Sequence, residues 1–81
     1  KSNFELAVAD KVADMRRLKG LSQSDLATIL EVTRGFIGQV ESPNSPSAYS
    51  LDHLNRLAFE LKCSVHDLIP AIPIVEGDWD N

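Results

Sequence analysis

The side chains best suited to metal or redox chemistry are a cysteine and a histidine near the C-terminal end. Cys63 and His66 are separated by two residues, a spacing that two ligands of one zinc ion can have. A structural zinc site needs four ligands, and no second pair stands near these two in the sequence, so we predict no metal site. We interpret Cys63 as a small apolar residue and His66 as a surface residue of a capped turn.

Patterns for catalysis are missing as well. Serine, histidine and aspartate all occur, but no Gly-x-Ser-x-Gly turn would hold a nucleophile in place. The sequence also has no glycine-rich phosphate loop and no paired catalytic carboxylates. We therefore predict that the protein is not an enzyme and that it uses no cofactor.

Charged side chains are distributed unevenly. The net charge of −4 argues mildly against nucleic acid, whose binding domains usually carry a basic excess. Residues 70–81, however, contain three acidic residues and no basic one, whereas residues 11–39 contain five basic residues and three acidic ones. The acidic tail thus hides a locally basic segment, and the net charge does not exclude nucleic acid.

Length and composition limit the protein to one small domain. The 81 residues are 43% apolar and 25% charged, which is a globular profile. A single cysteine excludes an intramolecular disulfide and is typical of a reducing, cytoplasmic environment. No apolar run exceeds four residues, and no charged start precedes an apolar stretch, so we expect neither a membrane span nor a secretory signal.

Five helix-start signals divide the chain. Capping boxes of the Ser-x-x-acid type begin at Ser2, Ser22 and Ser64, and Thr33 and Ser50 are two further N-cap candidates. Apolar residues follow these starts at helical spacing. They are Phe4, Val8, Val12 and Met15; Leu26, Ala27 and Leu30; Ile37 and Val40; Leu51, Leu54, Leu57, Ala58 and Leu61; and Val65, Leu68 and Ile69.

Glycine and proline mark where the helices end. Gly20 ends the first helix. Pro43 and Pro46 prevent helix formation in the middle loop, residues 42–50, because proline lacks the N–H that a helix needs. The sequence therefore predicts an all-α bundle of about five short helices with an extended C-terminal tail.

Two of these helices occupy residues 23–41 with only a short connection between them. Ala27 is small enough to let the second helix cross closely over the first. Ile37 and Val40, one turn apart, anchor the second helix to the core. This pattern is typical of a helix-turn-helix, whose second helix lies in the major groove of DNA.

The sequence resembles the Cro and phage-repressor (XRE-type) family of helix-turn-helix proteins. The resemblance implies a five-helix, sequence-specific DNA-binding domain that usually works as a dimer. It also implies that Arg16 pairs with Glu41 in a structural salt bridge and that Gln23 hydrogen-bonds a phosphate. The matching segments are Met15-Arg16-Arg17, Leu21-Ser22-Gln23, Leu26-Ala27, Val32-Thr33-Arg34, Ile37, Val40-Glu41, Leu54, Leu57-Ala58 and Val65-His66-Asp67-Leu68.

Two features depart from the pattern of this family. The ninth motif position, normally glycine in a left-handed turn, is Glu31, which would cost about 1 kcal/mol if the geometry is kept. Residues 42–50 carry no charge, whereas the family commonly has basic residues there. Fewer cations predict a weaker nonspecific attraction to DNA and a shallower salt dependence.

The candidate DNA contacts cluster at the start of the second helix. Arg34 could bind the O6 and N7 atoms of guanine, contact a phosphate, or remain a free surface charge. Thr33 is foremost a helix cap that can also touch phosphate, and Gln39 can reach the same groove or a phosphate. The uncharged loop adds weaker candidates for phosphate contacts: Asn44, Ser45, Ser47 and Tyr49.

Three further residues of this helix have two interpretations each. Gly35 and Gly38 either let the backbone approach the groove closely or simply weaken the helix. By helical phase Phe36 points away from the core, where it could press against a thymine methyl or a sugar. Its alternative is a satellite core contact against the proline loop.

We expect residues 1–69 to form the helix-turn-helix domain and residues 70–81 an extended acidic tail. Pro70 and Pro73 forbid a helix there, and Ile72 and Ile74 could share a face. We expect this tail to pack on a neighbouring subunit or on its own helices. The alternatives are a free end or a linker.

The leading functional prediction is a cytoplasmic transcriptional regulator that binds double-stranded DNA, works as a homodimer and reads the major groove with residues 33–41. The sequence indicates no small-molecule effector and no membrane partner. The alternative is a protein-interaction module of the antitoxin or adaptor type. The acidic balance, the uncharged loop and an exposed Phe36 favour this alternative.

Overall fold

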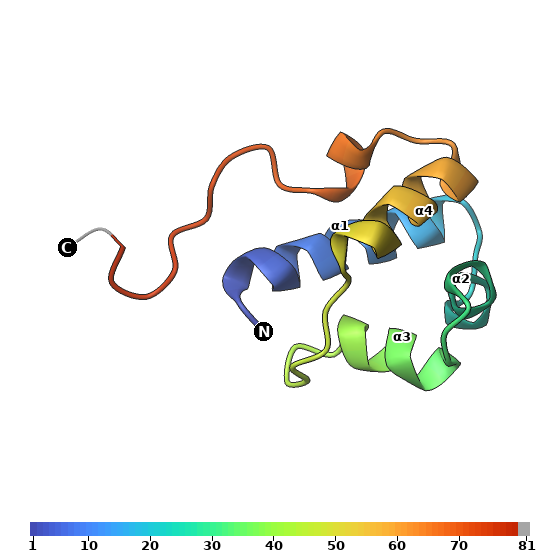
Figure 1. Ribbon diagram of the computed structural model, residues 1–81, viewed down its shortest axis with the longest axis horizontal. Coiled ribbons are helices and arrows are strands. Elements are labelled where there is room, and N and C mark those ends of the chain that lie inside the picture. Colours follow the sequence, from blue (N-terminus) through green and yellow to red (C-terminus); the bar gives the residue numbers. More distant parts are fainter. Residues whose placement is uncertain (80–81) are drawn as a thin grey trace.

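The computed structural model describes residues 1–79, which form four α-helices and a final 3-10 turn (Figure 1). No strand occurs within this described range, and none of its helices combines the length and apolar character needed to cross a membrane. The all-α prediction is therefore confirmed. The elements are α1 (Asn3–Leu18), α2 (Gln23–Leu30), α3 (Arg34–Glu41), α4 (Leu51–Leu61) and the 3-10 turn η1 (Val65–Leu68).

The last element is a single 3-10 turn where the sequence indicated a fifth helix. Ser64 caps its start, and the Asp67 carboxylate accepts a hydrogen bond from the Ser64 N–H at 2.9 Å. Pro70 restricts the residue before it to extended backbone, and Ile69 indeed has φ −128° and ψ 140°. The cap and the proline leave room for only one turn.

The predicted helix starts are all present. Ser2 and Ser22 form reciprocal capping boxes, in which their backbone N–H groups donate to the carboxylates of Glu5 and Asp25. These backbone hydrogen bonds lower the pKa of both carboxyl groups. Ser50 forms a similar box, which the sequence did not predict because the returning acceptor is an imidazole nitrogen, Nδ1 of His53.

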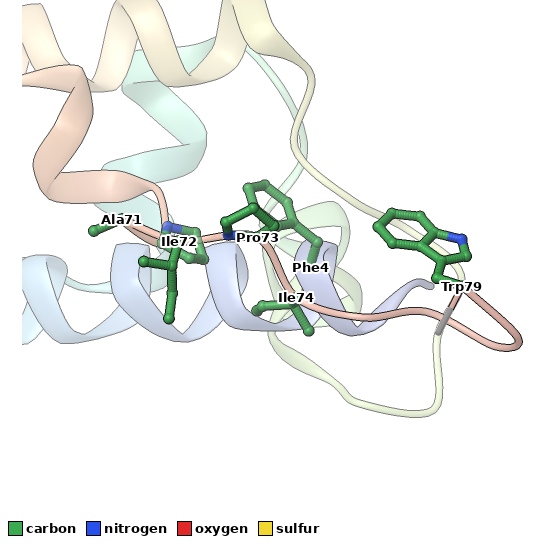
Figure 2. A pocket seen from close by; sticks show the side chains of 7 residues that line it. Phe4, Ala71, Ile72, Pro73, Ile74 and Trp79 are labelled. Atoms are coloured by element: carbon green, nitrogen blue, oxygen red, sulfur yellow. The ribbon is translucent and has the colours of Figure 1, made fainter. Parts of the chain in front are cut away.

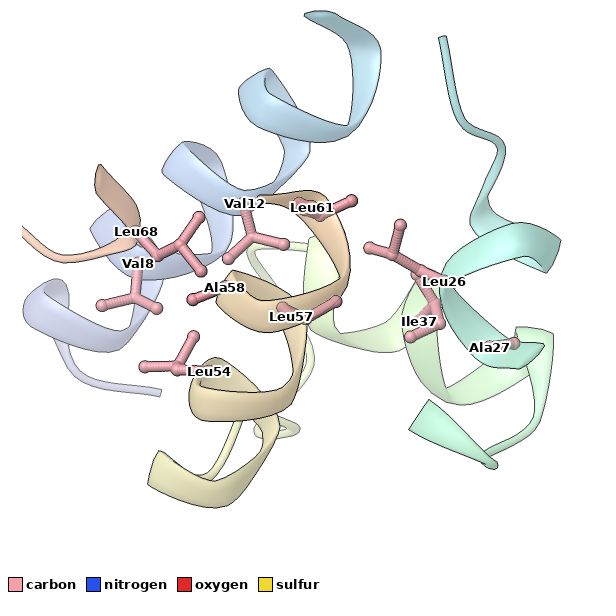
Figure 3. Packing of buried hydrophobic residues seen from close by; sticks show 10 residues of the cluster. All are labelled: Val8, Val12, Leu26, Ala27, Ile37, Leu54, Leu57, Ala58, Leu61 and Leu68. Atoms are coloured by element: carbon pink, nitrogen blue, oxygen red, sulfur yellow. The ribbon is translucent and has the colours of Figure 1, made fainter. Parts of the chain in front are cut away.

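One buried cluster joins all five elements (Figure 3). α2 packs against α3 and α4, and α1 packs against α3 and η1. Leu51 and Val65, which belong to the predicted apolar stripes, are exposed because they occupy the first positions of α4 and η1. The cluster consists of Val8, Val12, Leu26, Ala27, Ile37, Leu54, Leu57, Ala58, Leu61 and Leu68.

The tail runs without helix or strand from residue 70 to residue 76, turns at residues 77–79 and leaves the bundle past the start of α1 (Figure 1). It forms an open apolar hollow of about 390 Å³ together with Phe4 (Figure 2). Ile74 is half buried, whereas Ile72 and Trp79 remain 74% and 69% exposed. The tail thus contacts its own helices but keeps a large apolar surface open to solvent.

Candidate nucleic-acid interface

α3 lies along one edge of the molecule and has two distinct sides (Figure 1). Ile37 and Val40 are completely buried and attach the helix to the core. Thr33, Arg34 and Gln39 are exposed on the other side. A helix fixed on one side and polar on the other can present side chains to a groove without loosening the fold.

The start of α3 is capped locally and leaves a cation free. The Thr33 hydroxyl accepts a hydrogen bond from the Phe36 N–H at 3.1 Å. Arg34, the first helical residue, is exposed and forms no ion pair with any residue of the described chain. Its guanidinium therefore remains available to a phosphate or a base.

The two glycines of α3 are not required by contacts inside the chain. A Cβ atom at Gly35 would meet only the Thr33 Oγ1 atom, at 3.8 Å, and one at Gly38 would meet the Gln23 Oε1 atom, at 3.6 Å. Both distances are ordinary van der Waals contacts. An alanine therefore fits at either position, and no contact among the described residues requires glycine there.

Arg16 and Glu41 form the ion pair that the family resemblance implies. The Arg16 Nε and Nη2 atoms donate to Glu41 Oε2 and Oε1 at 2.9 and 3.0 Å, and both side chains are nearly buried, at 12% and 10% exposed. Arg16 also donates to the Leu21 carbonyl at 2.9 Å. One guanidinium thus links α1 to the end of α3 and to the loop before α2.

Gln23 contributes to the same group of contacts. Its side-chain amide donates to Glu41 Oε1 at 3.0 Å, so one of its two amide hydrogens is used within the protein. Burial raises the pKa of Glu41, but the hydrogen bonds from Arg16 and Gln23 and the arginine charge outweigh burial and lower it overall. Glu41 therefore stays ionised at neutral pH and ties α2 to α3.

With this geometry established, comparisons with known proteins identify the family. The sequence profile of the Cro/C1-type HTH DNA-binding domain matches residues 11–73. The chain belongs to this family. The helix-turn-helix of the Cro/C1-type domain is α2 and α3, and the match also covers the second half of α1, all of α4 and η1, and the beginning of the tail.

Two solved structures that share the fold come from different kinds of protein. The restriction-modification controller protein C.AhdI from Aeromonas hydrophila is 28% identical, with a TM-score of 0.66 over 79% of this chain and 94% of its own. Hydroxypropylphosphonic acid epoxidase from S. wedmorenis, in complex with fosfomycin, is 24% identical, with a TM-score of 0.71 over 84% of this chain and 35% of its own. No curated protein sequence gives a significant match.

The epoxidase likeness concerns the fold alone. At 24% identity it carries no functional information, and this chain spans only about a third of the length of the epoxidase. C.AhdI, by contrast, is matched over nearly its whole length. The same fold therefore occurs both as almost an entire protein and as one part of a longer one.

Phe36 supports α3 from the side and does not stand free on this Cro/C1-type domain. Its ring lies 5.6 Å from the His53 ring and 6.4 Å from the Tyr49 ring, measured between centroids, and the side chain is half buried. Of the two interpretations of Phe36, the satellite contact is the one present. Helical phase pointed Phe36 away from the core, whereas the ring packs beside the core cluster and next to Tyr49 of the loop and His53 of α4.

Tyr49 is likewise unavailable to phosphate, contrary to its place among the loop candidates. Its hydroxyl is buried and has no hydrogen-bond partner among the described residues. Burial, assisted by the negative charge of Glu41, raises the pKa of Tyr49 far above its ordinary value. The aromatic ring fills space beside Phe36, and the hydroxyl stays protonated.

The end of α3 is held by contacts that the sequence did not predict, one from Lys1 and one from Ser47, which was expected to contact phosphate. The Lys1 Nζ atom donates to the carbonyl oxygens of Val40 and Ser42 at 2.8 and 2.7 Å. The Ser47 hydroxyl donates to the Gln39 Oε1 atom at 3.2 Å, which orients the amide of this candidate DNA contact. Neither contact follows a local sequence pattern, since Lys1 lies 39 residues from Val40.

Proposed function

We propose that this Cro/C1-type domain belongs to a sequence-specific transcriptional regulator that reads the major groove of double-stranded DNA with the exposed side of α3. The observation that carries this proposal is the division of α3 into a buried side, with Ile37 and Val40, and an exposed side, with Arg34 free of ion pairs among the described residues. The likeness to a restriction-modification controller protein supports it.

Each exposed residue has a role in this proposal. Arg34 binds the O6 and N7 atoms of a guanine, and Gln39 reaches the same groove with an amide oriented by Ser47. Gln23 donates to a phosphate through the N–H groups that Glu41 does not use, and Thr33 touches a phosphate beside its cap. Phe36 supports the helix from behind.

Gly35 has no side chain and therefore lets the backbone of α3 approach the floor of the groove closely. Alanine fits at this position inside the protein and is a better helix former by about 1 kcal/mol. The proposal therefore predicts opposite effects of Gly35→Ala on the two measurable quantities. The variant should unfold at a higher temperature and bind its DNA site more weakly.

The proposal also includes a homodimer, cytoplasmic location and no enzymatic activity. Two recognition helices in a dimer should lie about 34 Å apart to enter successive major-groove faces. The exposed apolar side chains of Ile72 and Trp79 support a contact between subunits through the tail. Light scattering of the chain with and without residues 70–81 tests this contact, and an unchanged oligomer would exclude it.

The decisive experiment first finds the site and then removes one contact. Sheared genomic DNA retained by the protein at low salt is sequenced, and the recurrent motif is used in competition binding. Arg34→Ala should lower affinity for this motif by about ten- to a hundred-fold and relax the preference at one base position. Arg56→Ala, which removes an exposed cation paired with Glu60 on α4, should do neither.

The same binding experiment distinguishes a DNA-binding regulator from a protein-interaction module. A DNA-binding regulator loses affinity as salt rises, because bound counterions are released on association. The alternative of an interaction module has lost one of its supports, since Phe36 is covered by Tyr49 and His53. Equal binding of motif and random DNA by the folded protein would contradict the proposal and favour that alternative.

A further inference from the structure

We propose that Lys1 and Glu76 position the C-terminal end of α3, so that DNA binding depends on segments outside the helical bundle. This inference rests on the proposed function for its effect on DNA, but not for its effect on α3. Both residues lie beyond the helix-turn-helix, and both make hydrogen bonds that close the end of a helix distant in sequence.

α3 lacks the means by which the other helices end. α2 and α4 end in the left-handed residues Glu31 and Lys62, and α1 is followed by Gly20 with φ +72°. After α3, Ser42 has extended backbone, and the last turn contains no basic residue and ends in an acidic one. The carbonyl groups at this end, and the negative end of the helix dipole, need a donor from elsewhere.

Lys1 supplies this donor. Its ammonium group lies 2.8 Å from the Val40 carbonyl oxygen, 2.7 Å from that of Ser42 and 3.4 Å from that of Gln39. A cation at the C-terminal end of a helix is favourable because it opposes the partial negative charge there. Among the described residues, the only local cap bond at this end runs from the Ser42 N–H to the Gln39 carbonyl. Lys1 therefore supplies a donor to the Val40 and Ser42 carbonyl groups that the local chain does not supply.

Glu76 fixes the segment from which Lys1 extends. Its carboxylate accepts from the backbone N–H groups of Asn3 and Phe4 at 2.9 and 2.8 Å. Ser2 and Glu5 satisfy each other in the capping box of the same turn. The tail thus completes the start of α1, and it holds the backbone next to Lys1 in the position from which the ammonium reaches α3.

The apolar part of the tail adds to this attachment. Phe4 lines one hollow together with Pro70, Ile74 and other tail residues (Figure 2). The polar contact of Glu76 and the apolar contact of Phe4 therefore act on the same turn of α1. A change in the tail that moves this turn also moves Lys1 relative to α3.

The test uses two variants with charge-matched controls. Lys1→Met removes the donor, and Lys11→Met removes an exposed cation of α1 that forms no ion pair with a described residue. Glu76→Ala removes the carboxylate, and Asp78→Ala removes another exposed tail acid. Lys1→Arg keeps a positive donor at the first position and should restore wild-type behaviour.

Amide hydrogen exchange measures the end of α3 without DNA. Lys1→Met should speed exchange in the last turn of α3 by about two- to five-fold, and Glu76→Ala should act in the same direction. Lys11→Met and Asp78→Ala should leave this turn unchanged. Equal exchange in Lys1→Met and the wild type would overturn the positioning role.

DNA affinity gives an independent test, because the proposal and a purely electrostatic effect predict opposite changes for Glu76→Ala. Removing the negative charge of Glu76 should strengthen DNA binding if charge alone matters, as it should for Asp78→Ala. The proposal predicts the opposite for Glu76→Ala, a loss of about two- to five-fold. Faster exchange with an unweakened complex would overturn the effect on DNA. Faster exchange in a protein that never binds DNA would overturn the proposed function and leave Lys1 and Glu76 with a structural role.

Discussion

At its start α3 is capped by the residue next to it, whereas its end is held by residues from three other parts of the chain. The Thr33 hydroxyl accepts from the Phe36 N–H only three residues away. At the other end, Glu41 pairs with Arg16 of α1 and Gln23 of α2, and Lys1 caps the last carbonyl groups. The same helix therefore has one end that depends on local structure and one that depends on the tertiary fold.

This difference suits the role proposed for α3, which is to contact DNA. The start needs no tertiary contact for its cap, so its side chains are free to face a ligand. The end carries the connections to the fold and fixes the direction of the helix. A substitution at the start should affect recognition with a small loss of stability, and one at the end should affect stability strongly.

The largest expected loss of stability comes from Arg16→Met, which removes the ion pair with Glu41 at the end of α3. This variant leaves the Glu41 carboxylate nearly buried without its cation, and the free energy of unfolding should fall by about 3 kcal/mol. Urea unfolding followed by circular dichroism measures the change. Arg17→Met is the matched control, because its pair with Asp14 is exposed, is 3.6 Å long and contributes less than about 0.5 kcal/mol.

Breaking the start of α3 with Thr33→Ala should have a smaller effect. The variant loses one N-cap, and the free energy of unfolding should fall by about 1 kcal/mol. Thr33→Ser keeps the hydroxyl and should stay close to the wild type in the same urea titration. A loss as large as that of Arg16→Met would contradict the distinction between the two ends.

The end of α2 offers a contrast to the end of α3, because α2 is closed by its own next residue, Glu31, in a strained conformation. Glu31 has φ 57° and ψ 42°, the left-handed region that glycine adopts easily. Glu31→Gly should raise the free energy of unfolding by about 0.5–1 kcal/mol, measured by thermal unfolding. Glu31→Ala removes the same charge but keeps the strain, so a similar gain there would assign the effect to charge.

The pH dependence of the free energy of unfolding should be sensitive to changes at the end of α3, where Glu41 lies, and not to changes at its start. The pKa of Glu41 is lower in the folded protein than its ordinary value, so its contribution is complete above that value and disappears as the pH falls through the lowered one. Stability should therefore decrease on acidification below about pH 5. This decrease should be shallower in Arg16→Met, and equal slopes would contradict it, whereas Thr33→Ala should keep the wild-type slope.

The local parts of this structure could be predicted from the sequence. The capping boxes that begin at Ser2, Ser22 and Ser64 connect residues at most three apart, so their spacing is visible in the chain. The left-handed conformation of Glu31 was expected from its motif position, and it is present. The short fifth element was less predictable, because its length depends on how closely Pro70 follows.

The long-range parts could not be predicted in this way. Lys1 and Glu76 contact helix ends 39 to 73 residues away, and no local spacing indicates such pairs. Helical phase pointed Phe36 away from the core, whereas it packs beside the core cluster and next to Tyr49 and His53, whose positions depend on the path of the proline loop. The one distant pair that was expected, Arg16 with Glu41, came from the family resemblance and not from spacing.

The separation between anchoring and exposed residues of α3 has a consequence for how such domains diversify. The helix is attached through Ile37, Val40 and Glu41, and neither Arg34 nor Gly35 contributes to the core cluster. Single substitutions at positions 34 and 35 should therefore leave the packing of α3 intact, and under the proposed function such changes would alter the binding preference. Gln39 is less free to diverge, because a change there also releases Ser47.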